Sequence, residues 1–339
     1  MLFRSPGRAA ASCRTREGRG IYNHGFGTKL LRDLGGKPTI TVVQAFRYAG
    51  YTPTPHDLRE WVSQSLKNGA ARIEYYEVGE RFRNTPLYNE MLRLSGIFTK
   101  MNRVNIPDDP DTAILVSLDS EAGYHASRTG DHIYTAYSIL GERLGTWFKF
   151  VSERQIERGE VDLSIYKVIY LPLGKYFPKE ATGPVVNYVK NGGTLVIGDP
   201  EAFAFHRDGS SQAQYREQLV GARLEGQTSD EDTITMTAGK LKGRSYPIKK
   251  ANSVYDHIHV AHRVALSPKA KVLATFPSGQ PAVIEHAFGK GKVIYFTANP
   301  FAPDVVLIDS RIKELFREIQ QQAGTKLDRP IWRFLLPKG

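Results

Sequence analysis

The sequence of 339 residues holds a single cysteine, Cys13, and no apolar run near the roughly 20 residues that a membrane-spanning helix needs. One cysteine forms neither an internal disulfide nor a four-thiolate zinc site. The N-terminus also lacks the uninterrupted apolar stretch of a secretory signal. Disulfide scaffolds, cysteine–metal chemistry and membrane spans are therefore excluded, no membrane partner is expected, and the cellular compartment is left open.

Acidic residues are the scarcer charged class, with 35 Asp and Glu against 46 Lys and Arg and a net charge of +11. Five Arg and one Glu fall within residues 1–20, and residues 1–36 as a whole predict a disordered basic tail. The rest of the chain has no Lys/Arg run interleaved with aromatic residues, so nucleic-acid binding is not predicted. The hydrophobic fraction of 41% is that of a globular protein, and the length predicts two domains.

A nucleophile is missing at the turn where many α/β enzymes carry one. Such a turn exposes Cys or Ser directly after a strand, but here the strand that ends near Leu171 is followed by PLGK. The segment 288–292 (FGKGK) lacks the spacing of a phosphate loop and is typical of a hairpin turn. We therefore predict no catalytic nucleophile in this part of the chain, and no cofactor.

Four residues form the best candidate for a metal site: Asp256, His257, His259 and His262. Residues two apart on a strand point to the same face, so the first two imidazoles would lie side by side. No further ligand follows at a recognised spacing, which favours a surface loop or an edge strand. No metal site is predicted.

Residues 37–106 predict two strand–helix units. The β-branched run 39–46 predicts a buried parallel strand, Thr54-Pro55 predicts the start of a helix, and 71–78 predicts the second strand. A further helix is expected at about 86–101. Two parallel strands with their helices cannot cover both faces of a sheet, so we expect the rest of a larger (β/α)8 barrel to precede them.

After the linker 107–110 the pattern changes to short strands and helices in alternation, which is typical of a doubly wound α/β sheet. Strands are expected at 112–118, 147–152, 167–171 and 194–198, and helices at 131–144 and 179–190. An insertion or small β region is predicted at 201–265, then a β meander at 271–298, a helix at 309–323 and the start of a further β segment within 326–339. The predicted fold class is α/β: the end of a (β/α)8 barrel in 37–106, followed in 111–325 by a flavodoxin-like or amidotransferase-like sheet.

The strand ends of the first segment carry the candidate substrate-binding residues, because the chemistry of a (β/α)8 barrel lies at the carboxyl ends of its strands. These residues are Gln44, Tyr75, Tyr76 and Glu77. Amides and carboxylates bind sugar hydroxyls and aromatic rings stack on pyranose rings; the alternative is packing and solubility at the barrel rim. Retaining glycoside hydrolysis needs two carboxylates about 5 Å apart. Glu74 and Glu77 fall on opposite strand faces, so no catalytic pair is assigned.

Several longer sequence segments resemble those of a known protein family. KPTITVVQAF, TPHDLREWVSQSLKNGA and RIEYYEV resemble the last two strand–helix units of the catalytic barrel in β-galactosidase-like glycoside hydrolases related to family 42. AILVSLDSEAGYH, NGGTLVIGDP and FGKGKVIYF resemble the domain that follows it, the β-galactosidase trimerisation domain with its class I glutamine amidotransferase-like sheet. The resemblance covers roughly residues 37–324, and it implies a carbohydrate substrate and a homo-oligomer, specifically a trimer.

The resemblance implies hydrolysis of glycosidic bonds by displacement between two carboxylates. Family members carry the nucleophilic Glu near the end of the seventh barrel strand, where this sequence has Gln44, and the acid/base Glu on the fourth strand, which this sequence does not include. We therefore expect a C-terminal fragment of a β-galactosidase-like glycoside hydrolase, with no catalytic residue assigned and no activity of this chain alone. The alternative is a non-catalytic sugar-binding or oligomerisation module.

Overall fold

The computed structural model describes residues 22–45, 53–76, 82–101, 103–123, 130–228, 231–248, 260–302 and 310–339. The chain divides into two compact units. The first unit comprises the residues up to Asp108 together with Arg329–Gly339, and the second comprises Asp109–Asp328. The division falls within the proline-flanked segment 107–110.

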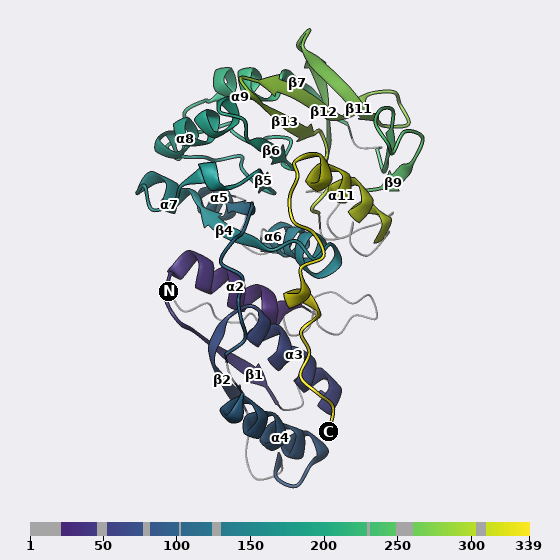
Figure 1. The fold of residues 1–339 in the computed structure, drawn as a ribbon. Coiled ribbons are helices and arrows are strands. Elements are labelled where there is room, and N and C mark those ends of the chain that lie inside the picture. The colour runs from purple at the N-terminus through teal and green to yellow at the C-terminus, as the bar shows by residue number, and fades with distance from the viewer. Residues whose placement is uncertain are drawn as a thin grey trace. The chain divides into compact units, whose positions relative to one another are not determined.

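The first unit contains a two-stranded parallel sheet, β1 (Thr39–Gln44) and β2 (Ala70–Tyr76). The connection between them is α3 (Pro55–Lys67), and α4 (Pro86–Lys100) follows β2 (Figure 1). Helix α3 begins where the sequence predicts, because the Thr54 hydroxyl accepts the Asp57 N–H while the Asp57 carboxylate accepts the Thr54 N–H at 2.7 Å. The helix side of the sheet packs on an apolar core: Val43, Leu58, Trp61, Val62, Leu66 and Leu94.

The prediction that residues 1–36 form a disordered tail is wrong for its last part, because Asn23–Gly35 form helix α2. The buried face of α2 includes Thr28, Lys29 and Asp33, and the Lys29 Nζ lies 3.1 Å from the Asp33 carboxylate. The His24 ring stacks on Trp61 with centroids 4.9 Å apart. Polar and aromatic contacts thus stabilise the helix. Because its buried face is polar, the residues of that face do not form the apolar pattern at helical spacing that predicts a packed helix.

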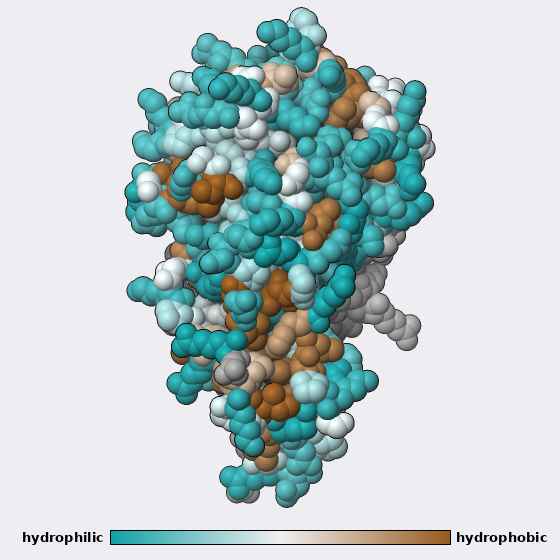
Figure 2. All heavy atoms as spheres, in the orientation of Figure 1, coloured by the Kyte–Doolittle hydropathy of each residue, from teal (hydrophilic) through white to brown (hydrophobic). Residues whose placement is uncertain are grey.

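The prediction that 326–339 begins a β segment is also wrong. Pro330–Arg333 form a 3-10 turn, and the residues after it run without regular secondary structure over the first unit. The Leu336 N–H donates to the Ser63 hydroxyl at 3.0 Å, and the Lys67 Nζ donates to the Trp332 carbonyl at 3.1 Å. At these two positions the backbone bonds to side chains of α3 rather than to a neighbouring strand. Figure 2 shows apolar side chains gathered on the visible face of this unit.

The second unit is built on a nine-stranded mixed sheet with the order β4-β3-β5-β6-β13-β12-β11-β8-β9. Its parallel half consists of β4 (Phe148–Ser152), β3 (Thr112–Val116), β5 (Val168–Leu171), β6 (Thr194–Ile197) and β13 (Gly291–Phe296). Its antiparallel half continues through β12 (Pro281–Phe288), β11 (Ala270–Thr275), β8 (Thr233–Met236) and β9 (Ser245–Pro247). The predicted α/β class, with a doubly wound sheet and a β meander, is confirmed.

Helices cover both faces of the parallel half (Figure 1). One face packs on α7 (Glu153–Glu157), α8 (Lys179–Lys190) and α9 (Ala213–Val220). The other packs on α6 (Gly130–Tyr137) and α11 (Lys313–Gln322), where Phe316 contacts Tyr170 and Phe296. The helix predicted at 131–144 changes after Tyr137 into a π-helical turn, Ser138–Arg143.

The predicted small β region 201–265 contributes to two sheets. Strands β8 and β9 extend the main sheet beyond the meander. Strands β7 (Ala222–Thr228) and β10 (Ala261–Leu266) pair with each other as a separate antiparallel sheet. A short helix, α5 (Leu118–Gly123), follows β3 at the carboxyl edge of the main sheet.

Candidate functional site

The strand ends of the first unit bring two of the predicted residues together. Gln44 and Tyr76 are register partners in neighbouring parallel strands, so their side chains lie on the same face of the sheet. The Ala45 N–H donates to the Tyr76 carbonyl at 3.0 Å, which holds the two strand ends side by side. Gln44 is partly buried and Tyr76 is 56% exposed. The sheet thus presents an amide beside an accessible phenol ring.

Tyr75 does not join this pair, because consecutive strand residues point to opposite faces. It is the register partner of the buried Val43 and packs against the apolar core of the first unit. Burial raises the pKa of the Tyr75 phenol, with Ser95 and Glu90 of α4 as its polar neighbours. Glu77, the fourth predicted residue, lies outside the described residues.

Glu74 is the one carboxylate that β1 and β2 carry. It shares the face of Gln44 and Tyr76, and its Oε1 lies 3.2 Å from the Arg72 Nε on the same strand. With a single carboxylate on the two strands, the described part of this unit does not assemble the pair that retaining glycoside hydrolysis requires.

The turn after β5 is built around a carboxylate rather than a nucleophile. The Gly174 N–H donates to the Asp199 Oδ2 at 2.9 Å, and the Glu201 N–H donates to its Oδ1 at 2.9 Å. Burial raises the pKa of Asp199 to about 6. A Cβ at Gly174 would lie 2.7 Å from the Leu171 side chain, so this position has no room for a serine or cysteine in the present packing.

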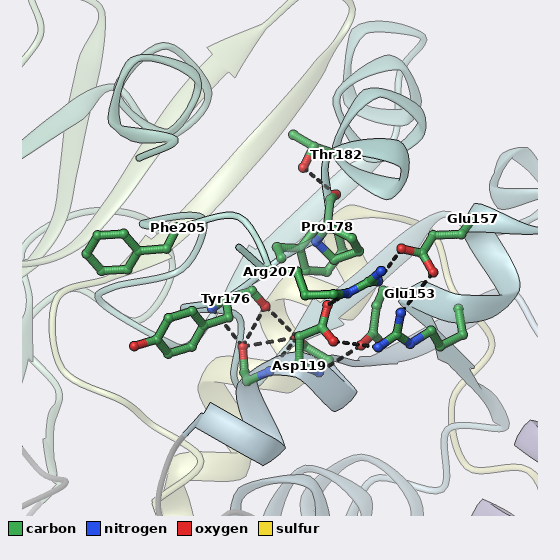
Figure 3. Close-up of polar contacts among 12 residues, drawn as sticks. Asp119, Glu153, Glu157, Tyr176, Pro178, Thr182, Phe205 and Arg207 are labelled. Atoms are coloured by element: carbon green, nitrogen blue, oxygen red, sulfur yellow. Dashed lines mark hydrogen bonds and ion pairs between the residues drawn. The ribbon is translucent and has the colours of Figure 1, made fainter. Parts of the chain in front are cut away.

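Four side chains at the carboxyl edge form a closed ring of ion pairs, which we call the ion-pair ring (Figure 3). The Arg154 Nη2 donates to the Asp119 Oδ1 at 2.6 Å, and its Nη1 lies 3.3 Å from the Glu157 Oε2. Arg207 completes the ring with its Nε 2.9 Å from the Asp119 Oδ2 and its Nη2 bonded to the Glu157 Oε1. The ring joins the segments that follow β3, β4 and β6.

A second layer of contacts lies beneath the ion-pair ring. The Asp119 N–H donates to the Glu153 Oε1 at 2.9 Å, and burial raises the pKa of this carboxyl. The Ser120 hydroxyl donates to the Tyr176 carbonyl at 2.9 Å and accepts the Tyr176 N–H at 3.0 Å. Ligands of open α/β sheets bind at such a carboxyl edge. Here the protein's own side chains link the ends of β3, β4 and β5.

The sequence reasoning missed the ion-pair ring, whose members are spread from position 119 to position 207. A usable signal was the set of polar residues where two predicted strands end: Ser117, Asp119 and Ser120 at one, and Ser152, Glu153 and Arg154 at the other. The candidate metal residues Asp256, His257 and His259 lie outside the described residues. His262 is buried, with its Nδ1 3.1 Å from the Val260 carbonyl.

The part of the chain that the structure describes holds no group of three His, Cys, Asp or Glu side chains placed to bind a metal. Within the same residues, no helix is both long and apolar enough to span a membrane.

Comparison with known proteins gives one family match and several relatives. Residues 111–326 match the model of the β-galactosidase trimerisation domain. A β-galactosidase of Planococcus sp. is 24% identical in an alignment 311 positions long that covers 82% of this chain and 45% of that protein. The chain therefore spans less than half the length of this curated relative.

Solved structures show the same fold. The β-galactosidase from Bacillus circulans sp. alkalophilus superposes with a TM-score of 0.72 and 17% identity, over 90% of this chain and 48% of that one. The β-galactosidase from Halorubrum lacusprofundi superposes with a TM-score of 0.71 and 17% identity, over 91% of this chain and 47% of that one. Both alignments extend beyond residues 111–326, because they include most of the first unit.

Proposed function

The chain belongs to the β-galactosidase trimerisation domain family through residues 111–326, and from this we propose that it is the C-terminal part of a β-galactosidase-like glycoside hydrolase. In this proposal, the strand–helix units within residues 37–106 are the end of a (β/α)8 catalytic barrel, and residues 111–325 are an oligomerisation domain. The carbohydrate substrate and the trimeric state are parts of the same proposal.

The observation that carries the proposal is the open face of the β1–β2 sheet. Ile40 is 51% exposed and Val42 is 50% exposed, whereas the neighbouring Val43 on the opposite face is fully buried. Parallel strands rich in β-branched residues are normally covered on both faces. An inward face that closes against further barrel strands accounts for this one-sided exposure, and it supports the assignment to a barrel.

Substrate binding is proposed for the strand ends on this face. The Gln44 amide would bond to sugar hydroxyls and the Tyr76 ring would contact a pyranose face. Glu77, the residue after Tyr76 in the sequence, is proposed as a further binding residue, and no position is assigned to it here. Tyr75 would support the site from behind through its packing against the core. Neither the nucleophile nor the acid/base of the two-carboxylate displacement is assigned to this chain.

The test compares two proteins with a chromogenic β-galactoside. This chain alone is expected to give no hydrolysis above background, and the product of a longer reading frame that completes the barrel is expected to hydrolyse it. In that longer protein, Gln44→Ala is expected to raise KM more than it lowers kcat. Hydrolysis by the chain alone, or an inactive complete barrel, would contradict the proposal.

The second candidate is a non-catalytic sugar-binding or oligomerisation module. Gln44 favours it, because an amide occupies the position that the family resemblance gives to the nucleophilic carboxylate. Light scattering after size-exclusion chromatography is expected to give a mass three times the 38.0 kDa of one chain. A trimer whose complete barrel binds galactose and does not hydrolyse galactosides would establish this second candidate in place of the first.

A further inference from the structure

The second unit contains a groove at the amino ends of β5 and β6, at the opposite end of these strands from the ion-pair ring. Its volume is about 740 Å³, within the usual range for small-molecule sites. The walls come from the turn Leu163–Ile165, the C-terminal half of α8 and the end of α11. No motif of the sequence pointed to this groove.

Two asparagines supply the polar wall of the groove. Asn187 and Asn191 lie four residues apart at the C-terminal end of α8, so their side chains emerge from one side of the helix. Both residues are exposed, and within the described residues neither side-chain amide has a hydrogen-bond partner. Each amide offers a donor and an acceptor to a ligand. The exposed Ser164 adds a hydroxyl to the lining.

The remaining lining suits a neutral ligand. Val161, Leu163 and Pro184 give apolar surface. Lys167 is the one cation among the lining residues. Its Nζ already bonds to the Gly324 carbonyl and lies 3.9 Å from the Asp111 carboxylate. The exposed Asp162 carboxylate accepts the Ser164 N–H at 2.9 Å and disfavours an anionic ligand.

The lining thus combines two amides, a hydroxyl and a carboxylate with apolar surface. This combination suits a sugar, because sugar hydroxyls need donors and acceptors and the C–H face of the ring needs apolar contact. We propose that this groove is a second carbohydrate-binding site, for a neutral mono- or disaccharide, separate from the strand ends of the first unit. The choice of ligand class rests on the proposed glycosidase function.

The experiment measures binding of methyl β-galactoside and lactose to the full chain by isothermal titration calorimetry and saturation-transfer NMR. The double variant Asn187→Ala/Asn191→Ala is expected to weaken binding about tenfold or more, because it removes two amide contacts. Asn89→Ala, on an exposed face of α4, is the matched control and is expected to bind like the unmodified chain. Galacturonate is expected to bind more weakly than the neutral sugars because of Asp162.

Two further variants keep the outcome decisive. Ser164→Leu narrows the groove without altering α8, so it tests the site if the double variant fails to fold, and it is also expected to weaken binding. Gln44→Ala/Tyr76→Ala removes any binding at the strand ends of the first unit, so the binding that remains reports on the groove, and adding Asn187→Ala/Asn191→Ala is expected to weaken it. The groove is not a sugar site if the unmodified chain does not bind, or if the double variant and Ser164→Leu both bind as tightly as the unmodified chain. Neither result would affect the hydrolysis test of the proposed function.

Discussion

The two units use the same kind of strand in opposite ways. In the second unit β3, β5 and β6 are buried at every residue, because helices cover both faces of the sheet. In the first unit Thr39 and Val43 of β1 are buried whereas Ile40 and Val42 are exposed, although its sequence, TITVVQ, is equally β-branched. A β-branched run therefore predicts a parallel strand in both units, but it does not predict that the described chain covers both of its faces.

The largest expected difference between the units is in the loss of stability when an isoleucine is replaced by alanine in a strand of each. Ile114→Ala in β3 removes a fully buried side chain and is expected to lower the free energy of unfolding of the second unit by about 4 kcal/mol. Ile40→Ala in β1 removes a side chain that is 51% exposed and is expected to change the stability of the first unit by less than about 0.5 kcal/mol. Hydrogen-exchange mass spectrometry reports on each unit separately.

Ile40→Ala can also be made in a longer protein that completes the barrel. There, it is expected to lower the free energy of unfolding several-fold more than in this chain, because the open face would pack against other strands. An equally small loss of stability in the longer protein would argue that the face stays exposed, and that the barrel assignment of the first unit is wrong.

Acid is expected to act on the two units in opposite directions. Burial lowers the pKa of His24 in the first unit to about 4, whereas burial raises the pKa of Asp199 in the second unit to about 6. The pKa of each group differs from its ordinary value by enough to change the free energy of unfolding by about 3 kcal/mol across the titration. The buried carboxyl of Glu153 adds to the effect in the second unit, because its pKa is also raised.

The signs follow from which state binds the proton more tightly. The imidazole of His24 is protonated first in the unfolded chain, so the first unit loses stability as the pH falls from about 6.5 to 4. Asp199 is protonated first in the folded protein, so the second unit gains stability as the pH falls from about 6 to 3.8.

The variants His24→Phe and Asp199→Asn isolate these two contributions. Each is expected to flatten the pH dependence of its own unit and to leave the other unit unchanged. Hydrogen exchange between pH 7 and pH 4.5, corrected for the intrinsic exchange rate, gives the measurement. The same pH response in a variant and the unmodified chain would show that the substituted group does not titrate as its burial implies.

Much of the fold could be predicted because buried strands and capped helices leave local patterns. Helix α8 has the predicted bounds 179–190, and α3 begins at the predicted Thr54-Pro55. Helix α2 could not be predicted, because Lys29 and Asp33 occupy its buried face and satisfy each other there. Local periodicity identifies apolar faces, and it misses a face that is buried as an ion pair.

The candidate site shows a similar limit. Gln44 and Tyr76 could be predicted as neighbours, since the carboxyl ends of adjacent parallel strands meet at one edge. The prediction did not separate Tyr75 from Tyr76, although strand alternation places them on opposite faces. The groove beside α8 and the ion-pair ring depend on segments that are distant in sequence, so only the topology of the sheet brings their residues together.

Substitutions in the ion-pair ring are expected to have a smaller effect on stability than the loss of a buried side chain or the titration of a buried group. Asp119 is 8% exposed, but Arg154 is 34% and Arg207 is 45% exposed, so water and salt screen the pairs. Arg207→Gln is expected to lower the stability of the second unit by about 1 kcal/mol, and the loss should shrink in 1 M salt. Ile114→Ala lies in the same unit and removes no charge, so it is the control for the effect of salt itself.

A double-mutant cycle of Asp119→Asn and Arg207→Gln measures the coupling between these two side chains directly. The expected coupling is about 0.5 to 1 kcal/mol at low salt. The ring also ties the segment after β6 to the one after β3, so local exchange of residues 205–211 should accelerate in either single variant. Independent effects of the two substitutions, with unchanged exchange at 205–211, would reduce the ring to surface charges that happen to lie close together. The carboxyl edge of the second unit would then have to be held by buried contacts such as those of Glu153, Ser120 and Asp199.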